Sequence, residues 1–395
     1  MKSSLKLRLM TVMAAAVLVA LCATPVCAAN KVVHYLVTDD NTAGANTATF
    51  YIAGPGPKLT QKKVVQTGGQ GTGFGFYGSS RVSVIHDQTA GCAYVTDAAS
   101  NDIAGIVVAT QKVTGNFKGS STDNGGMNAI GLASNSKFLY ASFPGSNTIA
   151  TFKILSGCKL KFVKDASATG LHGGTVDGMA LNGKILVVAY VDGSIQSFNI
   201  SHGAPVSNGD EQNSTGSASG ALPAGVDISQ DGHFAIFGDA VSGVVDVEVS
   251  DISSGKLTTT VNYSSLASGA NSNNVRLSPD GSLLYVSINF SGEVAAAFFD
   301  KTTGVLKPGC TSSPLKGFGS TWFVAVGLAT QSTTGSGSPL FVAESAEGTP
   351  PSSIGIVRVR SSGGKCHLTE SVDSPASDPN SSALRSIGAF PPRPF

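Results

Sequence analysis

The stretch Asp280-Gly281-Ser282-Leu283-Leu284-Tyr285-Val286-Ser287 places a glycine turn before a short apolar strand that reaches an aromatic residue. A second strand opens at Val294, nine positions after Tyr285. Other parts of the chain repeat this offset, namely Tyr94 with Ile103, Tyr140 with Ile149 and Ile236 with Val245. The register of the strands therefore recurs along the chain, and not only their composition.

Equivalent anchor residues can be placed about once every fifty residues, a period typical of repeat folds. They give seven copies, anchored at Tyr35, Tyr94, Tyr140, Val187, Ile236, Tyr285 and Phe341. Each copy contains several short strands and no helical periodicity between them, which favours one four-stranded blade per repeat. We therefore expect an all-β fold, a seven-bladed β-propeller with four-stranded antiparallel blades, as a single domain over residues 29–395.

The two ends of the repeat region are incomplete in complementary ways. Residues 32–37 resemble the second strand of a blade whose first strand is missing, and residues 383–390 form an isolated strand after the seventh blade. An open ring would expose two unpaired sheet edges. We therefore predict that the C-terminal strand completes the first blade and closes the ring, with a dangling tail as the alternative.

The first residues have the pattern of a signal peptide. Basic residues precede an apolar run over residues 10–21, and a small-residue cleavage site follows at residues 26–28. The pattern predicts a signal peptide over residues 1–28, and hence a periplasmic or extracellular protein with no membrane span after cleavage. A lipoprotein anchor at Cys22 or Cys27 is the alternative, although bulky residues precede both cysteines.

Charge is low and evenly distributed. The chain has 26 basic and 25 acidic residues, a formal net charge of +1, and no run of basic residues. Such a distribution predicts neither a nucleic acid nor an anionic membrane as a partner. We expect a monomer that binds a small polar or anionic ligand, a glycan or an envelope protein.

Four cysteines follow the leader: Cys92, Cys158, Cys310 and Cys366. Export would place them in an oxidising compartment, where two disulfides with three alternative connectivities are expected. Their positions in neighbouring repeats favour Cys92 with Cys158 and Cys310 with Cys366. No pair has the short spacing of a structural zinc site, and the six histidines lack paired spacing, so we predict no metal and no cofactor.

Two motifs carry a resemblance to a known family. They are Ala93-Tyr94-Val95-Thr96-Asp97 and Leu277-Ser278-Pro279-Asp280-Gly281-Ser282-Leu283-Leu284-Tyr285-Val286. Both resemble the YVTN-repeat and lactonase-type propellers, a group that includes 6-phosphogluconolactonase and the carboxymuconate-cyclising enzymes. The resemblance covers all seven repeats and implies the propeller fold. For the enzymatic members it also implies the opening or closing of a lactone.

The resemblance further implies an Arg-His pair, or a lone histidine, near the start of the innermost strand of several blades. This chain keeps only the arginine, Arg81. Non-basic residues stand where the resemblance implies histidine, namely Val82, Ala129, Gly178 and Asn274. Lactone chemistry needs a proton donor or acceptor and a cation for the oxyanion. In an enzyme, Arg81 would supply the cation, and Asp177 the base if desolvation raised its pKa.

The polar residues at these inner-strand positions form the candidate site, since equivalent positions on successive blades converge on the central channel. They are Arg81, Asn128, Asp177, Asn273 and Asn274. Together they would suit a small polar or anionic ligand held by arginine and amides. The alternative is that the same groups line a water-filled channel and satisfy one another. Small-residue stretches elsewhere, such as residues 207–220 and 374–382, are expected to be surface loops.

Two functions remain open from the sequence. The first is an exported binding or scaffold protein that uses the channel mouth or a loop face. The second is a lactone hydrolase or cycloisomerase that acts on a sugar lactone or a carboxylated lactone through Arg81 and Asp177.

Overall fold

A computed structural model of the chain describes residues 34–54, 58–73, 81–85, 91–119, 131–215, 222–240, 243–268, 271–288, 291–317, 324–330 (backbone only), 339–345, 351–381, 384 and 386–390. The leader predicted over residues 1–28 lies outside these ranges, and so does Asn128. Residues from His34 onward form one compact unit.

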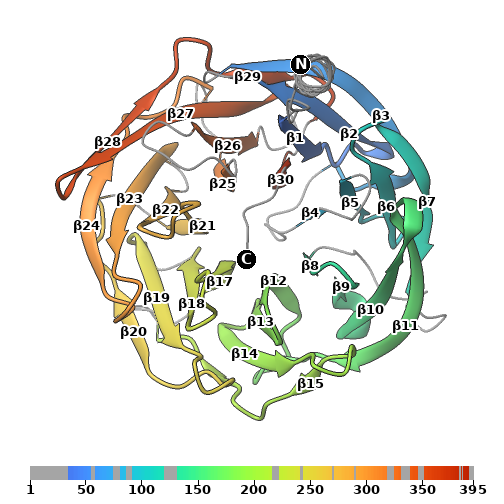
Figure 1. Cartoon of the computed structure of the whole chain (residues 1–395), viewed down its shortest axis with the longest axis horizontal. Helices are drawn as coiled ribbons and strands as arrows, with labels where there is room; N and C mark the ends of the chain where they lie inside the picture. Colours follow the sequence, from blue (N-terminus) through green and yellow to red (C-terminus); the bar gives the residue numbers. More distant parts are fainter. Residues whose placement is uncertain are drawn as a thin grey trace, which may run out of the picture. The chain divides into compact units, whose positions relative to one another are not determined.

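This unit is a ring of seven antiparallel sheets, the blades, which follow one another in chain order (Figure 1). From the inside outward, blade one contains β30 (Ser386–Phe390), β1 (His34–Asp39), β2 (Gly44–Ala53) and β3 (Leu59–Gly71). Blade two contains β4 (Val82–Ile85), β5 (Cys92–Asp97), β6 (Asp102–Val107) and β7 (Lys112–Lys118). Blade three contains β8 (Leu132–Ser134), β9 (Phe138–Phe143), β10 (Thr148–Leu155) and β11 (Lys159–Ser167), with short 3-10 turns η2 (Pro144–Ser146) and η3 (Ser156–Cys158).

The remaining blades follow the same plan. Blade four contains β12 (Val176–Asn182), β13 (Ile185–Tyr190), β14 (Ser194–Asn199), and an outer edge split into β15 (Val206–Ser207) and β16 (Gln212–Asn213). Blade five contains β17 (Pro223–Ile228), β18 (Phe234–Asp239), β19 (Asp246–Asp251) and β20 (Thr260–Tyr263). Blade six contains β21 (Ser272–Leu277), β22 (Leu283–Ile288), β23 (Glu293–Phe299) and β24 (Leu306–Thr311). Blade seven contains β25 (Val324–Thr330), β26 (Pro339–Ser345), β27 (Ser352–Ser362), β28 (Lys365–Glu370) and β29 (Ala376–Asp378). The predicted seven-bladed propeller is confirmed.

The seven anchors of the sequence repeat all lie on the second strand of a blade, on β1, β5, β9, β13, β18, β22 and β26. The partner nine positions later lies on the third strand or, for Val245, directly before it. In blade six, for example, Tyr285 faces Ala296 and Val294 faces Ser287. The repeated offset therefore measures the length of one strand and one turn.

The hydrophobic core is divided into seven clusters, and each cluster lies between two neighbouring blades. Tyr140 of blade three, for example, packs with Leu186 and Phe198 of blade four. Phe341 of blade seven packs with Leu36 of blade one. Each anchor packs toward the next blade, so a blade alone would leave its apolar faces in water.

The C-terminal strand closes the ring, as the sequence predicts. β30 pairs antiparallel with β1, from Tyr35 opposite Phe390 to Asp39 opposite Ser386. Its side chain Ile387 joins the cluster between blades seven and one. The paired strand begins at Ser386, three residues later than the predicted start.

Two of the stretches predicted to be surface loops contain strands. Residues 207–220 include β16, which pairs with β14, and residues 374–382 include β29, which pairs with β27. The prediction was wrong there because strands of two or three residues are too short to show an alternating pattern in the sequence.

Two disulfides join neighbouring blades, in the pairing that the sequence favours. Cys92 on β5 is bonded to Cys158 in η3, with an S–S distance of 2.04 Å and a Cα–Cα distance of 5.5 Å. Cys310 on β24 is bonded to Cys366 on β28, with a Cα–Cα distance of 5.7 Å. Within the described residues, no helix is long and apolar enough to cross a membrane.

The antiparallel order gives the ring two different faces. We call the first the mouth face, because the inner strand of each blade begins there and the predicted site lies on it. The second and third strands of each blade are also joined at this face. We call the other the turn face. There the first strand turns into the second, and the third strand turns into the fourth.

Deleting the closing strand tests whether closure of the ring stabilises the fold. Deletion of residues 383–395 should expose the unpaired edge of β1 and the cluster around Phe341 and Leu36. We expect the midpoint of thermal unfolding to fall by more than about 5 °C, because several kcal/mol of burial and strand pairing are lost. Deletion of residues 391–395 alone is the control. An unchanged midpoint in the longer deletion would show that β30 is dispensable.

The disulfides should differ in their access to reductant. Cys92 and Cys158 are buried, whereas Cys310 and Cys366 are half-buried. Mild reductant should therefore release the thiols of Cys310 and Cys366 first, as measured by alkylation and peptide mapping. The double substitution of Cys92 and Cys158 by alanine should cost about 2 to 4 kcal/mol of unfolding free energy. Simultaneous alkylation of all four cysteines would contradict the expected order.

Candidate functional site

The inner strands of four blades carry a bulge close to the mouth face. The pairing register jumps between Val176 and Gly178, Pro223 and Gly225, Ser272 and Val275, and Ala325 and Gly327. A bulge inserts an unpaired residue and re-aims its side chain. The candidate site residues Asp177, Asn273 and Asn274 all occupy such bulge positions.

Glycine follows three of these bulges, and at two of them, Gly178 and Gly225, the inner strands approach one another closely. A Cβ atom at Gly178 would lie 2.0 Å from the carbonyl oxygen of Ala224 in blade five. A Cβ atom at Gly225 would lie 2.5 Å from Cα of Asn274 in blade six. Neither position can hold a larger residue unless the backbone shifts. Gly178 stands where the family resemblance implies histidine, so the packing itself excludes that side chain.

Arg81 is the central charge of the site. It directly precedes β4, and only 3% of its surface is exposed. Burial lowers the pKa of its guanidinium, while the carboxylates of Asp39 and Asp177 counter that shift. Arg81 thus interacts with an acid from blade one and an acid from blade four. The sequence analysis placed Arg81 and Asp177 in one candidate site but missed Asp39.

Asp39 ends β1 and is fully buried. Its Oδ1 accepts hydrogen bonds from the Asn41 backbone N–H at 3.0 Å and from Asn46 Nδ2 at 3.1 Å, and its Oδ2 accepts one from Thr96 Oγ1 at 3.3 Å. Burial raises the pKa of Asp39, although Arg81 and these donors favour the ionised form. The site therefore contains a carboxyl group that holds its proton more tightly than usual.

A polar network continues from Asp39 toward the outside of the ring. Asn46 Nδ2 also donates to Asp97 Oδ1 at 2.9 Å, and the same oxygen accepts from Thr67 Oγ1 at 2.6 Å. Asn116 Nδ2 donates to Asp97 Oδ2 at 2.9 Å. Burial raises the pKa of Asp97 to about 8, with Asp102 and Asp39 adding to the shift. This network joins blades one and two along the mouth face.

Asn273 and Asn274 belong to blade six, on the other side of the ring from blade two (Figure 1). The Asn274 backbone N–H donates to Ser287 Oγ at 2.8 Å. Both asparagine side chains are mostly buried, with slightly more exposure than Arg81 and Asp177. The predicted set therefore forms two groups, a charged one around Arg81 and an amide one in blade six.

The described histidines lie away from Arg81. His34 begins β1 at the turn face, His202 and His233 are exposed in turns of that face, and His367 lies on the outer strand β28. His172 precedes β12, but its Nε2 is 2.9 Å from Oδ1 of Asn213 on the outer edge of blade four. A channel position for His172 is therefore not observed. No group of metal-binding side chains occurs among the described residues.

Glu344 is a second buried acid near the mouth face, on β26 opposite Ala325. Its Oε2 accepts a hydrogen bond from Ser353 Oγ, and its Oε1 has no hydrogen-bond partner among the described residues. Burial raises the pKa of Glu344 to about 7, and Glu370 adds to the shift. Glu248 on β19 is similarly buried, with its pKa raised to about 7.

The sequence contained a signal for these acids. Asp97 and Asp239 each end a second strand, three positions after their anchors Tyr94 and Ile236, and Asp39 ends β1 four positions after Tyr35. Aligning the repeats would have revealed acids at the mouth face. Their burial and their proximity to Arg81 depend on the packing of neighbouring blades.

No family model matches the chain, and no curated protein matches it in sequence. Solved structures match over most of its length. A candidate 6-phosphogluconolactonase from Bacteroides uniformis shares 12% identity over 91% of this chain and 99% of its own, with a TM-score of 0.65. A candidate 6-phosphogluconolactonase from Bacteroides fragilis shares 17% identity over 92% and 99%, with a TM-score of 0.64. A functionally unknown protein from Desulfotomaculum acetoxidans shares 13% identity over 85% and 98%, with a TM-score of 0.60.

These likenesses establish the fold of the chain. Identities of this size carry no information about its chemistry, because the same propeller supports unrelated activities. The chain therefore has the fold of lactonase-type propellers, and its function has to be argued from the site.

The raised pKa of Glu344 gives a pH test of the buried acids. An unfolded glutamate titrates near about 4.3, so the folded state binds the proton more tightly and loses stability as pH rises from there to about 7. Glu344→Gln should reduce this pH-dependent loss of unfolding free energy by on the order of 2 to 3 kcal/mol. The unfolding free energy can be measured by urea denaturation at several pH values.

Glu248→Gln is the matched variant, because burial raises the pKa of Glu248 to the same value. In Glu248→Gln the unfolding free energy should depend less on pH, by a similar amount. The double variant should show a still weaker dependence. Part of the pH dependence of stability would remain in every variant, because Asp97 also has a raised pKa and also destabilises the folded state as pH rises. A Glu344→Gln profile identical to that of the unaltered protein would contradict a protonated Glu344.

Proposed function

We propose that the protein is an exported, non-catalytic propeller that binds an uncharged polar ligand, such as a glycan, at the mouth face. The observation that carries this proposal is the enclosure of Arg81 between Asp39 and Asp177. Two carboxylates already compensate the positive charge of Arg81, the only arginine among the described residues of the site. An anionic ligand would have to compete with them, whereas hydroxyl groups can bind to carboxylate and amide groups together.

The amide group in blade six supports the same ligand class. Asn273 and Asn274 each carry an amide donor and acceptor at a bulge, a position that re-aims side chains. Their backbone is held by Ser287 and by the close approach of Gly225, so little order has to be gained on binding. Export is supported by the leader pattern and by the two disulfides.

Catalysis by the family chemistry is disfavoured by packing. The inner-strand position of Gly178 has no room for the implied histidine. His34, His202, His233 and His367 lie at the turn face or on an outer strand, and His172, in the mouth-face loop before β12, is held at the outer edge of blade four by Asn213. The site thus has an arginine without the histidine that the enzymatic relatives would pair with it.

A lactone hydrolase is the second candidate, and one observation favours it. Asp39 is a buried carboxyl group with a raised pKa beside Arg81. A base with a raised pKa next to a cation is the pair that lactone opening requires. In such an enzyme Asp39 would accept the proton of the attacking water, and Arg81 would hold the oxyanion.

Glycan binding can be measured by calorimetry against neutral and anionic oligosaccharides. We expect binding of neutral ligands, and the double variant Asn273→Ala and Asn274→Ala should weaken it about tenfold through the loss of two hydrogen bonds. Asn199→Ala, in an exposed turn of the opposite face, is the control and should bind normally. A preference for anionic ligands that is lost in Arg81→Ala would overturn the proposed ligand class.

Turnover of gluconolactone and muconolactone separates the two candidates. A binding protein should show no turnover above the spontaneous reaction. Turnover that is lost in Asp39→Asn, with the fold intact by circular dichroism, would establish the hydrolase instead. Turnover that survives in Asp39→Asn, Arg81→Ala and Asp177→Asn would place an active site elsewhere in the chain and would also overturn the proposal.

A further inference from the structure

Every blade presents at least one exposed lysine in a turn of the turn face. In the order of the blades these are Lys58, Lys112, Lys137 with Lys159, Lys184, Lys256, Lys301 and Lys365. Most of these lysines belong to different repeats and lie far apart in the sequence, so they do not form a run of basic residues. The repeat geometry brings them to one side of the ring.

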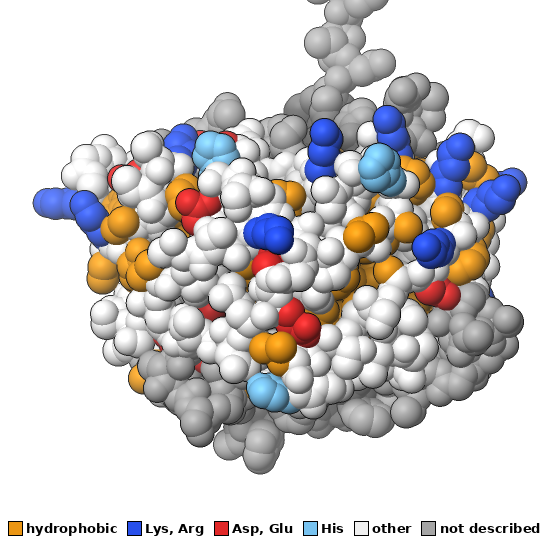
Figure 2. Space-filling model, turned by 90° about the horizontal axis from the view of Figure 1, so that it is seen from below, with side chains coloured by type: hydrophobic (Ala, Val, Ile, Leu, Met, Phe, Trp, Pro, Cys, Tyr) orange, Lys and Arg blue, Asp and Glu red, His pale blue; other side chains and the backbone are white. Residues whose placement is uncertain are grey.

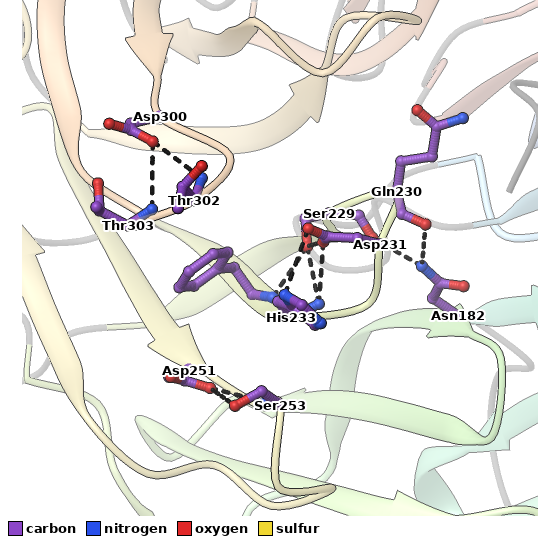
Figure 3. Close-up of polar contacts among 11 residues, drawn as sticks. Asn182, Ser229, Gln230, Asp231, His233, Asp251, Ser253, Asp300, Thr302 and Thr303 are labelled. Atoms are coloured by element: carbon purple, nitrogen blue, oxygen red, sulfur yellow. Dashed lines mark hydrogen bonds and ion pairs between the residues drawn. The ribbon is translucent and has the colours of Figure 1, made fainter.

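The exposed or half-buried acids described in these turns are confined to blades five and six, and Figure 3 shows three of them. Asp231 accepts from Ser229 Oγ at 2.6 Å, Asp251 from Ser253 Oγ at 2.6 Å, and Asp300 from the Thr302 backbone N–H at 2.9 Å. In the neighbouring turn, Asp280 accepts from Ser278 Oγ at 2.6 Å. Each carboxylate is engaged by donors of its own turn, and these bonds lower its pKa.

In the described turns, the other five blades form a basic arc from blade seven through blades one to four. We define the lysine arc as Lys365, Lys58, Lys112, Lys137, Lys159 and Lys184. No described acid lies in the turns that carry these residues, and Asp87, between β4 and β5, lies outside the described residues. The ion pairs of His233 with Asp231 and of Arg276 with Asp227 involve no lysine. Figure 2 shows Lys and Arg side chains gathered along the upper half of the side in view.

Several acids of the mouth face cannot pair with the lysines of a second copy of the chain, because Asp39, Asp97, Asp177 and Glu344 are all buried. Asp373, after the outer strand β28, is exposed at this face. Self-association through such acids is therefore an outcome that the test has to distinguish from docking on lipid.

We propose that the turn face docks on an anionic phospholipid surface through the lysine arc. Turns of successive blades end near one plane, so the arc is a set of separated charges that suits a flat array of phosphates better than a narrow polymer. Each lysine near such a surface contributes favourably within a Debye length. Leu155 and Val206, 37% and 60% exposed beside these turns in blades three and four, add apolar contact.

Docking in this orientation leaves the predicted ligand site accessible, because the mouth face is opposite the turn face. The proposal is independent of the proposed function, since no residue of the lysine arc belongs to the site around Arg81. It also revises the sequence expectation of no anionic membrane partner, which was based on the scattered order of charges along the chain.

The test is cosedimentation of the purified protein with vesicles of phosphatidylglycerol and phosphatidylcholine, compared with vesicles of phosphatidylcholine alone. We expect binding to the anionic vesicles only, lost between about 50 and about 500 mM salt. The triple variant of Lys137, Lys159 and Lys184 to glutamine should weaken binding on the order of 100-fold, at about fivefold per lysine.

The control is the triple variant of Lys118, Lys164 and Lys316 to glutamine, which removes the same charge from the mouth end of blades two, three and six. It should bind almost normally. Equal weakening by both variants would mean that net charge alone matters and would overturn the oriented docking. Absence of binding to anionic vesicles would also overturn it, as would salt-sensitive self-association on gel filtration that is lost in the first variant only.

Discussion

Each blade of this protein can bury its apolar faces only against its neighbours. The seven core clusters all lie between blades, so the core exists only when the ring is complete. The pairing of β30 with β1 supplies the last interface and removes the exposed edges. The two disulfides reinforce interfaces of the same kind, between blades two and three and between blades six and seven. Stability is therefore distributed around the ring and depends on its closure.

Closure also determines what the centre can contain. Seven inner strands converge there, and at Gly178 and Gly225 the neighbouring backbone lies where a side chain would begin. Bulges interrupt the pairing of the inner strands at Asp177, Asn273 and Asn274, and a bulge re-aims the side chain that it leaves unpaired. At Gly178 the same crowding removes the space in which a histidine could sit. This restriction supports the proposed binding role over the acid–base chemistry that the family resemblance implies.

The two faces differ in how their charges are solvated. At the mouth face carboxyl groups are buried, and they are stabilised by Arg81, by hydroxyl and amide donors, or by retaining a proton. At the turn face the acids remain in water and are engaged by their own turns, while lysines project from all seven blades. One repeat unit therefore generates a buried polar network on one side and an exposed cationic surface on the other.

The sequence by itself determined the number of blades, the register of the second and third strands and the closing strand, because these follow from a repeat that is local in the chain. It favoured the observed disulfide pairing but left other connectivities open. It also selected Arg81 and Asp177 as candidate site residues from their positions at the start of an inner strand. It could not reveal the proximity of Asp39 to Arg81, the bulges, or the lack of space at Gly178, since each depends on contacts between blades. The lysine arc was hidden for the same reason: residues one repeat apart in the chain become neighbours only when the strands are wound into a ring.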